Sequence, residues 1–486
     1  MKNRFFGLAF LGLAVLALFA ACSFAGDLEA LKKEVLGESS GNAKPSTKWY
    51  TDNTAATKYT ITTADELAGL AKIVNAGDTF EGSYDFAGKT ITLGADIDLS
   101  AYGKKYNNGR GWIPIGHNTN STGYFKGTFD GNNHTISNLY INNKSYTHTG
   151  LFGELGLYVV TGEQGVYNLN LADVDITSVG NYVGAVAGHV VGDFGHWIIK
   201  NCSVTGKISG VSNTGGVAGY VNYNCHISKC SFSGTVNGDR SVGGIVGEFI
   251  AADMINCYST GWVRGNTNVG GVAGNSENGG GIKNCYSTSS VIGAIINAGG
   301  IVGSNENPII NCYSTGNIQG DSNVGGIAGV LKSGYTSIGN CYAAGPITGN
   351  SNVGGVAGIA NNDCTINRCA ALNGEISSAN AADTATFGRV AGVSTALLNN
   401  LAFNNMLVDN SIINAGTGDT TKHGADISKE EATTQTTYSG NGTRELDWPF
   451  GNDDDHPWKW GNEAYPLPVL YWQDAASYPP LPGHLK

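Results

Sequence analysis

The sequence predicts an all-β protein folded as a parallel β-helix, a β-solenoid of about ten coils. One observation is a series of cysteines at steps of 28, 27, 28, 27, 29 and 28 residues: Cys202, Cys230, Cys257, Cys285, Cys312, Cys341 and Cys369. A second is a glycine-rich run that recurs with the same period, such as VGGIVG at 242–247 and VGGVAG at 269–274. A third is a β-branched residue six positions after most of these cysteines. Short β-branched segments separated by glycine-rich runs are typical of a β-helix rather than of helical or leucine-rich repeats.

The cysteine position is predicted to be a small apolar core site. Leu139, Leu169 and Leu401 hold the same place in neighbouring coils, which argues against a metal or redox role. Successive coils lie about 4.8 Å apart, and their equivalent side chains point the same way. A disulfide needs converging Cβ directions, so we expect these thiols to be buried and unpaired. Cys225 and Cys364 stand outside this series, each five residues before one of its members, Cys230 and Cys369. Each could form a local disulfide or remain a free thiol.

An asparagine precedes the cysteine position in most coils. The set is Asn138, Asn168, Asn201, Asn256, Asn284, Asn311, Asn340 and Asn400. An apolar residue stands two positions earlier, and two apolar sites three apart do not fit one continuous strand. We expect a corner there, because asparagine tolerates the left-handed backbone that a corner needs. Its amide can then hydrogen-bond the next coil, giving an asparagine ladder.

The residue after the cysteine is predicted to face outward. Four successive coils carry tyrosine there: Tyr258, Tyr286, Tyr313 and Tyr342. An exposed aromatic row of this kind can bind a sugar face or a partner protein. The alternative is that the rings stack on one another and only stabilise the sheet.

The repeat I-x-N-C-Y-S-T-G followed by V-G-G-[IV]-[AV]-G resembles the GLUG repeat of bacterial surface and secreted proteins. Segments outside the repeats are similar to that family as well: 67–77, 89–100, 112–116, 125–139, 150–155 and 448–472. The resemblance covers about residues 59–475 and implies a right-handed parallel β-helix with an adhesin-like role. Some members are metallopeptidases with an H-E-x-x-H motif. No histidine of this chain is directly followed by a glutamate, so the resemblance does not imply metallopeptidase activity.

The N-terminus predicts export. Lys2 and Arg4 precede an apolar run from Phe5 to Ala21, which is the pattern of a signal peptide. Phe19-Ala20-Ala21-Cys22 reads as a lipobox with Cys22 as the lipidated residue, and cleavage after Ala25 is the alternative. The predicted organisation is a signal peptide at 1–21, a lipid-anchored spacer at 22–58, the β-helix at 59–424 and a C-terminal cap segment at 425–486.

Both ends of the β-helix are predicted to be capped. Thr63 and Glu66 form a capping box that begins a helix running to about Asn75 and stopping at Gly77. Such a helix would cover the unpaired edge of the first coil. Trp448, Trp458, Trp460 and Trp472 are expected to cover the other end, with a sugar-binding platform as the alternative.

The net charge and the placement of the acidic residues limit which partners and activities the sequence predicts. The formal net charge is −11, and it becomes −13 without Lys2 and Arg4, so nucleic acid and anionic membranes are poor partners. Asp96-Ile-Asp98, Asp130 and Asp453–Asp455 could hold calcium, but Asx turns are the favoured interpretation. Acidic residues of the coils fall at different repeat positions. We find no catalytic constellation, no metal site and no cofactor motif.

The sequence therefore predicts a non-enzymatic, exported surface protein, either a bacterial outer-membrane or cell-surface lipoprotein or a secreted protein. It would act as an adhesion or display rod that binds an extracellular protein or a glycan. The alternative is a carbohydrate-active enzyme, a polysaccharide lyase or glycoside hydrolase, on a β-helix. Convergent carboxylates on one face would favour the enzyme, and uniform polar ladders would favour the rod.

Overall fold

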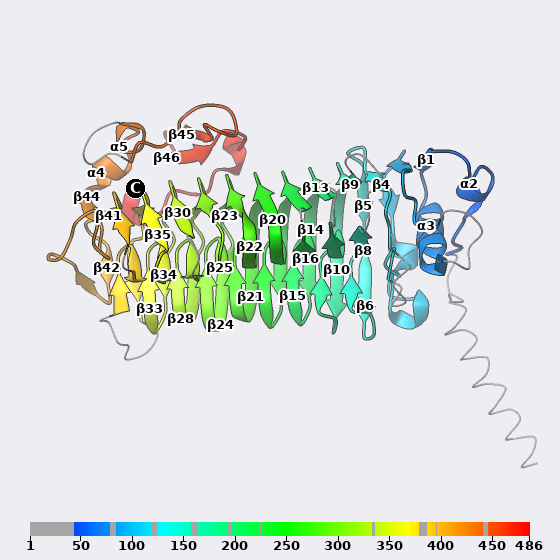
Figure 1. The fold of residues 1–486 in the computed structure, drawn as a ribbon, viewed down its shortest axis with the longest axis horizontal. Coiled ribbons are helices and arrows are strands. Elements are labelled where there is room, and N and C mark those ends of the chain that lie inside the picture. Colours follow the sequence, from blue (N-terminus) through cyan, green and yellow to red (C-terminus); the bar gives the residue numbers. More distant parts are fainter. Residues whose placement is uncertain are drawn as a thin grey trace, which may run out of the picture.

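The computed structural model describes residues 43–77, 84–117, 124–156, 164–192, 197–223, 225–332, 336–378, 386–394, 396–440 and 446–486. The predicted signal peptide and Cys22 lie outside these residues. The chain forms a β-solenoid of about 11 turns, whose coils stack along one long axis (Figure 1). The predicted all-β parallel β-helix is confirmed.

Most strands of the described chain belong to two long sheets. Sheet A contains β1 (Lys58–Ile61), β2 (Thr90–Leu93), β4 (Thr128–Asp130), β8 (Phe152–Gly156), β9 (Gln164–Tyr167), β12 (Ala187–Val191), β13 (Trp197–Lys200), β16 (Ala218–Asn222), β17 (Cys225–Ser228), β20 (Val246–Ile255), β22 (Ala273–Lys283), β25 (Val302–Asn305), β26 (Ile309–Ile310), β29 (Ala328–Leu331), β30 (Ser337–Gly339), β34 (Ala357–Ala360), β35 (Thr365–Asn367), β39 (Ala391–Val393) and β40 (Leu397–Leu398).

Sheet B contains β3 (Ile97–Asp98), β5 (Thr135–Ser137), β6 (Tyr140–Asn143), β7 (His148–Thr149), β10 (Asn170–Ser178), β11 (Tyr182–Val183), β14 (Ser203–Ser209), β15 (Ser212–Gly215), β18 (Ser231–Asn237), β19 (Arg240–Gly243), β21 (Tyr258–Gly270), β23 (Tyr286–Ser287), β24 (Ser290–Gly299), β27 (Tyr313–Ser314), β28 (Ile318–Gly325), β31 (Tyr342–Ala343), β32 (Ile347–Thr348), β33 (Ser351–Gly354), β36 (Ala370–Ala371), β37 (Glu375–Ser377), β38 (Phe387–Gly388), β41 (Leu401–Phe403), β42 (Leu407–Val408), β43 (Ser411–Ile412) and β44 (Ala425–Ile427).

Coils pair with one another at equivalent repeat positions. β21 pairs in parallel with β24, which places Val263 opposite Val291, and β24 pairs with β28, which places Val291 opposite Ile318. Each position of the repeat therefore forms a row that runs along the solenoid. The inward rows make one continuous apolar core.

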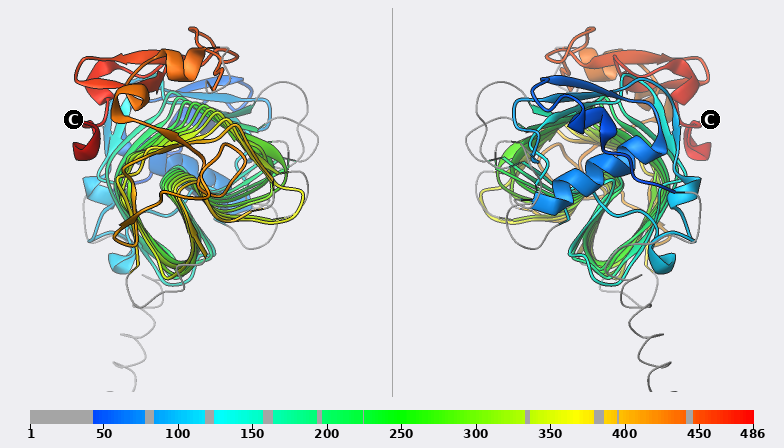
Figure 2. Two further views of the ribbon diagram at one scale, coloured as in Figure 1. Left: turned by 90° about the vertical axis from the view of Figure 1, so that its left-hand side faces the viewer. Right: turned by 90° about the vertical axis from the view of Figure 1, so that its right-hand side faces the viewer.

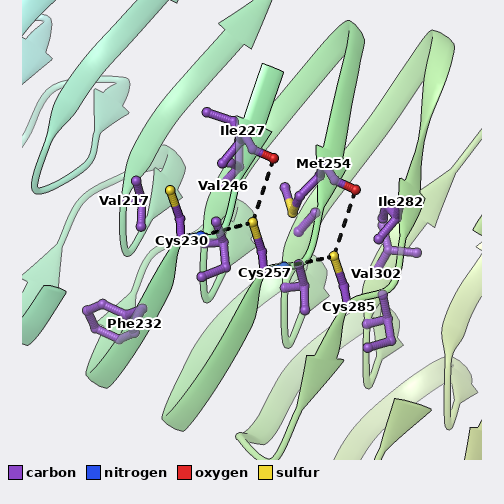
Figure 3. Close-up of a cluster of buried hydrophobic side chains, with 14 of the residues drawn as sticks. Val217, Ile227, Cys230, Phe232, Val246, Met254, Cys257, Ile282, Cys285 and Val302 are labelled. Carbon is purple, nitrogen blue, oxygen red and sulfur yellow. Dashed lines mark hydrogen bonds between the residues drawn. The ribbon is translucent and has the colours of Figure 1, made fainter. Parts of the chain in front are cut away.

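The cysteine row lies inside this core (Figure 3). The Cys257 thiol accepts a hydrogen bond from the Cys230 backbone N–H at 3.5 Å and donates one to the Ile227 carbonyl at 3.7 Å. The nine described cysteines, which include Cys225 and Cys364, are free and buried, as predicted for the ladder. Burial raises the pKa of the Cys257 and Cys230 thiols well above the usual value, so they stay protonated.

The glycine-rich run permits two backbones to touch inside the coil stack. A Cβ added at Gly271 would lie 2.1 Å from the Gly300 carbonyl oxygen and 2.3 Å from the Ser287 hydroxyl. The neighbouring Val272 is completely buried. Seen along the axis, successive coils superpose closely (Figure 2). A larger side chain at this glycine would force the coils apart.

The predicted asparagine corner is confirmed in most coils. The left-handed residues of this row are Asn138, Asn168, Asn201, Lys229, Asn256, Asn284, Asn311, Asn340 and Arg368. The Asn311 amide donates to the Asn284 side chain at 3.2 Å, and Asn340 donates to Asn311 at 3.1 Å. In the last coil Asn399, not Asn400, is left-handed.

A second asparagine row was not predicted. Its members precede the valine or alanine that begins the glycine run: Asn268, Asn297, Asn323 and Asn352. Each is left-handed, and each amide after the first donates to the previous side chain at 2.7 to 2.8 Å.

The N-terminal end is closed by α3 (Ala64–Ala76), with the predicted capping box of Thr63 and Glu66 and a C-cap at Gly77. α2 (Lys48–Thr51) lies beside it, and Tyr50 is buried. The folded body therefore begins by residue 43, inside the segment that was predicted to be a spacer. Short 3₁₀ helices follow at η2 (Ser100–Tyr102) and η3 (Asn107–Gly109).

The C-terminal part differs from the prediction. β44 still pairs with β41, so the solenoid continues past residue 424. After α4 (Lys429–Ala432) and α5 (Thr436–Ser439), the chain turns back along the side of the coils (Figure 1). We call residues 446–486 the C-terminal strap. It contains the antiparallel hairpin of β45 (Trp458–Asn462) and β46 (Tyr465–Leu470), then η5 (Ala475–Ser477) and η6 (Gly483–Leu485).

Replacing Asn311 by Leu should lower the free energy of unfolding by about 1–2 kcal/mol. The change strains a left-handed backbone and breaks two amide contacts of the ladder. Chemical denaturation measures the effect, and Asn311→Gly separates the two causes because glycine keeps the backbone freedom. Asn317 in the same coil is exposed, and Asn317→Leu is the control. Equal stability of Asn311→Leu and wild type would contradict a stabilising ladder.

Candidate functional site

The tyrosine row that was predicted to be an exposed stripe is mostly buried. Tyr286, Tyr313 and Tyr342 are at most 1% exposed, whereas Tyr258 is partly exposed. Consecutive rings lie 4.9, 5.0 and 4.9 Å apart, with interplanar angles of 4°, 4° and 1°. The rings thus form one parallel stack on the outside of the coils.

The C-terminal strap covers this stack. The ring centroid of Trp472 lies 5.6 Å from that of Tyr286, and Trp458 lies 6.1 Å from Tyr342. The Tyr313 hydroxyl donates to Gln473 at 2.8 Å. Burial raises the pKa of Tyr313 well above its usual value. The expectation of an exposed binding stripe is wrong, because a row of aromatic rings is an apolar strip that the chain's own tryptophans bury.

The strap also reaches the asparagine ladder. Asp454 accepts a hydrogen bond from the Asn256 amide at 2.8 Å through its carboxylate, and from the Asn284 amide at 3.1 Å through its backbone carbonyl. The Trp458 indole donates to the Asn311 side chain at 3.3 Å. The strap's tryptophans therefore pack over a lateral face of the solenoid, not over its open end as predicted.

The acidic segments considered for calcium form local turns at Asp98 and Asp453, and a contact between coils at Asp96. Asp96 accepts the Thr135 backbone N–H of the next coil at 2.9 Å, and Asp98 accepts that of Ser100 at 2.9 Å. Asp453 accepts the His456 backbone N–H at 2.7 Å. These bonds lower the pKa of all three carboxyls, for Asp98 mainly through the Asn138 side chain. The geometry agrees with the favoured Asx-turn interpretation for Asp98, Asp130 and Asp453, each of which accepts the N–H two residues later, and not for Asp96.

An ionisable row on sheet A was missed by the sequence analysis. It occupies the position directly after the last glycine of each run and consists, in register, of Glu154, His189, Tyr220, Glu248, Asn275 and Ser304. We call it the polar row. The signal was present in the sequence, since GLFGEL (150–155) and VGAVAGH (183–189) align at their last glycines, Gly153 and Gly188.

One end of the polar row is a histidine–glutamate cluster. Nδ1 of His148 lies 3.3 Å from one carboxylate oxygen of Glu154, and Nδ1 of His189 lies 3.1 Å from the other. Their ligand atoms all lie within 4.8 Å of one another. Burial lowers the pKa of His148 more than the Glu154 charge raises it, and His189 lowers it further. The rings of Tyr182 and Tyr220 stand 5.4 and 5.1 Å from that of His189.

The other end of the polar row carries carboxylates and a lysine. The Asn275 amide donates to Glu277 at 3.0 Å, and the Lys332 ammonium lies 2.7 Å from Glu277 and 3.5 Å from Glu306. The hydrogen bond from Lys332 lowers the pKa of Glu277. Burial, with the Glu277 charge, raises the pKa of Glu248. Two neighbouring carboxyl groups whose pKa values shift in opposite directions are typical of sites for acid–base catalysis.

An exposed aromatic residue lies on sheet B. Trp262 is 44% exposed, and the guanidinium carbon of Arg264 lies 4.7 Å from its ring centroid. Thr235 and Ser290 flank Trp262 on the two adjacent coils. This arrangement offers an aromatic face, hydroxyl groups and a cation to the solvent.

Comparison with known proteins gives relatives for part of the chain. No family model matches. A halomucin of Haloquadratum walsbyi is 36% identical over 177 residues, which are 36% of this chain and 2% of the halomucin. A protein of Evansella cellulosilytica, provisionally named a Gly-rich membrane protein, is 35% identical over 156 residues, 32% of this chain and 15% of that protein. The chain thus spans only a small part of each relative's length.

One solved structure was also found. A Bacteroides ovatus protein, provisionally named an immunoglobulin A1 protease, aligns with 86% of this chain and 93% of its own, at 20% identity and a TM-score of 0.35. A likeness this low carries no argument about function. Within the part of the chain that the structure describes, no helix has the length and apolar character to cross a bilayer.

Replacing Tyr313 by Ser should lower the free energy of unfolding by about 3–5 kcal/mol, because it removes a buried ring from the middle of the stack. It should also loosen the strap, which limited proteolysis detects as earlier cleavage within 446–486. Tyr258→Ser at the partly exposed end of the stack is the matched control and should cost less. Wild-type stability and protease resistance of Tyr313→Ser would show that the strap does not depend on the stack.

Proposed function

We propose that the protein is a non-enzymatic, exported surface protein, a β-helical rod that binds a glycan or an extracellular protein. The observation that supports it most is the architecture. About 11 coils stack along one long axis (Figure 1). Repeated coils of this kind make an extended surface rather than one enclosed site.

The exposed sheet B around Trp262 is the contact surface in this proposal. An indole ring can pack against the apolar face of a sugar, and the adjacent hydroxyls and guanidinium can hydrogen-bond its rim. The buried tyrosine row is not available for this purpose. Binding is therefore assigned to Trp262, which is exposed on the regular coils.

Export and lipid anchoring at Cys22 belong to the same proposal. The names of the relatives, a halomucin and a Gly-rich membrane protein, support a surface or membrane-associated setting. The resemblance of the repeats to GLUG repeats supports it further. A lipid-linked Cys22 would hold the rod at a membrane without a spanning helix.

A second candidate function is carbohydrate cleavage, and one observation favours it. Glu248 and Glu277 lie near each other on one face and have pKa values shifted in opposite directions. Against it, the ammonium of Lys332 already pairs with Glu277 and Glu306. A lysine held between two carboxylates is an ion-pair network that joins three coils, so we place this function second.

Screening the purified protein against glycan and matrix-protein arrays tests the proposal. We expect a bound ligand whose affinity falls at least about tenfold in Trp262→Ala, since one stacking aromatic contributes on the order of 1–3 kcal/mol to such contacts. Val179→Ala removes another exposed apolar side chain and should bind normally. Release of saccharide products from any polysaccharide, lost in Glu277→Gln, would instead establish the enzyme. Equal binding by Trp262→Ala and wild type would remove Trp262 as the contact.

A further inference from the structure

The histidine–glutamate cluster contains a carboxylate with an unusual set of partners. The Glu154 side chain is 10% exposed. Among the described residues, the basic groups within salt-bridge distance of it are the imidazoles of His148 and His189. A buried ionised carboxylate is costly unless a cation or several hydrogen-bond donors compensate it. Neither Lys nor Arg supplies that cation within the described residues.

The spacing of the three groups is that of metal ligands. Direct charge-assisted hydrogen bonds between nitrogen and a carboxylate are about 2.7–2.9 Å long. The two distances here are longer, 3.3 Å for His148 and 3.1 Å for His189. Around a tetrahedral zinc ion with ligands at about 2.0–2.1 Å, adjacent ligand atoms stand about 3.3 Å apart. The two imidazoles approach different oxygens of Glu154, His148 at Oε2 and His189 at Oε1, and each distance is close to the length of such an edge. The three groups each offer one ligand atom within 4.8 Å of the others.

A second observation concerns His189 itself. Both of its ring nitrogens are shielded from solvent, and neither has a hydrogen-bond partner in the structure. Buried polar atoms of this kind are rare, because each unsatisfied one is costly. Nδ1 nevertheless faces the Glu154 carboxylate at 3.1 Å. A cation between these two atoms satisfies the Nδ1 lone pair and neutralises the carboxylate together.

We propose that His148, Glu154 and His189 form a binding site for a divalent transition-metal ion, most suitably Zn²⁺. Two imidazoles and one carboxylate suit zinc, whereas calcium and magnesium prefer oxygen ligands alone. Three protein ligands leave one position for water. This site lies outside the surface assigned to ligand binding, so the proposal stands apart from the adhesive function.

The placement of the ligands gives the ion a structural role. His148 lies on β7 of sheet B, whereas Glu154 and His189 lie on β8 and β12 of sheet A. A bound ion therefore joins the two sheets and two successive coils near the N-terminal end. The rings of Tyr182 and Tyr220 pack beside His189 and fix its orientation.

Titration of the tag-free, chelator-treated protein with ZnCl₂ tests the site. We expect one ion per chain by isothermal titration calorimetry and a higher melting temperature with zinc than without it. X-ray absorption of the zinc-loaded protein should show nitrogen and oxygen ligands at about 2.0–2.1 Å. This measurement uses the wild-type protein, so its outcome does not depend on whether a variant folds. Absence of stoichiometric binding, or a coordination shell without histidine, would overturn the proposal.

Variants then assign the ion to these residues. His189→Gln and Glu154→Gln should each weaken zinc binding by at least about tenfold and abolish the rise in melting temperature. The matched control is His226→Gln, because His226 also lies near a carboxylate, that of Asp253 at 3.4 Å, but outside the cluster. Undiminished zinc affinity in both cluster variants would place the ion elsewhere and contradict the assignment.

Discussion

In-register parallel stacking is the constraint on which the rest of the structure depends. Coils about 4.8 Å apart place every side chain against its own equivalents in the two neighbouring coils. A repeat position is therefore filled well only by a residue that packs against copies of itself. Cysteine inside, asparagine at the corners and glycine at the backbone contacts all meet that condition. Like charges do not, because equal charges at this spacing repel one another.

The scarcity and arrangement of charges follow from the same constraint. In the polar row, glutamate alternates with histidine, tyrosine and asparagine instead of repeating. In the turns, Asp239 accepts from the amide of Asn266 one coil further on, and Asp321 accepts likewise from Asn350. Acidic side chains in both settings are compensated by a neutral or basic residue in the next coil. The histidine–glutamate cluster lies at one end of the polar row, and the Lys332 network lies at the other.

On the outside of the coils, repetition of an apolar residue exposes an apolar strip to solvent. A tyrosine that repeats at one outward position gives an apolar strip along the solenoid, and such strips are sites of association. The C-terminal strap turns this strip into a second core, with Trp472 and Trp458 over the rings. The strap thus shields this aromatic strip from other chains. Trp262, which lies on the same strand β21 as Tyr258, stays 44% exposed.

Features set by the repeat were predictable from the sequence, and features set by distant contacts were not. The cysteine core, the asparagine corner and the helix beginning at Thr63 each depend on local spacing, and all three were predicted correctly. The strap depends on contacts between segments more than a hundred residues apart, such as Tyr342 with Tyr465, which no period reveals. The pairing of Glu154 with His189 was missed because the early coils have irregular lengths, which hides their register.

The most direct test of in-register stacking under the strap is hydrogen–deuterium exchange of the whole protein, read out by mass spectrometry. Our account predicts the slowest exchange in the strands from Tyr258 to Ala343, where each amide bonds to a neighbouring coil and the strap excludes water. Strap peptides from β45 and β46 should be protected together with those coils. Rapid exchange in β45 and β46 while the coils stay protected would show that the strap does not pack on the tyrosine row. Rapid exchange throughout Tyr258 to Ala343 would contradict the stacked coils themselves.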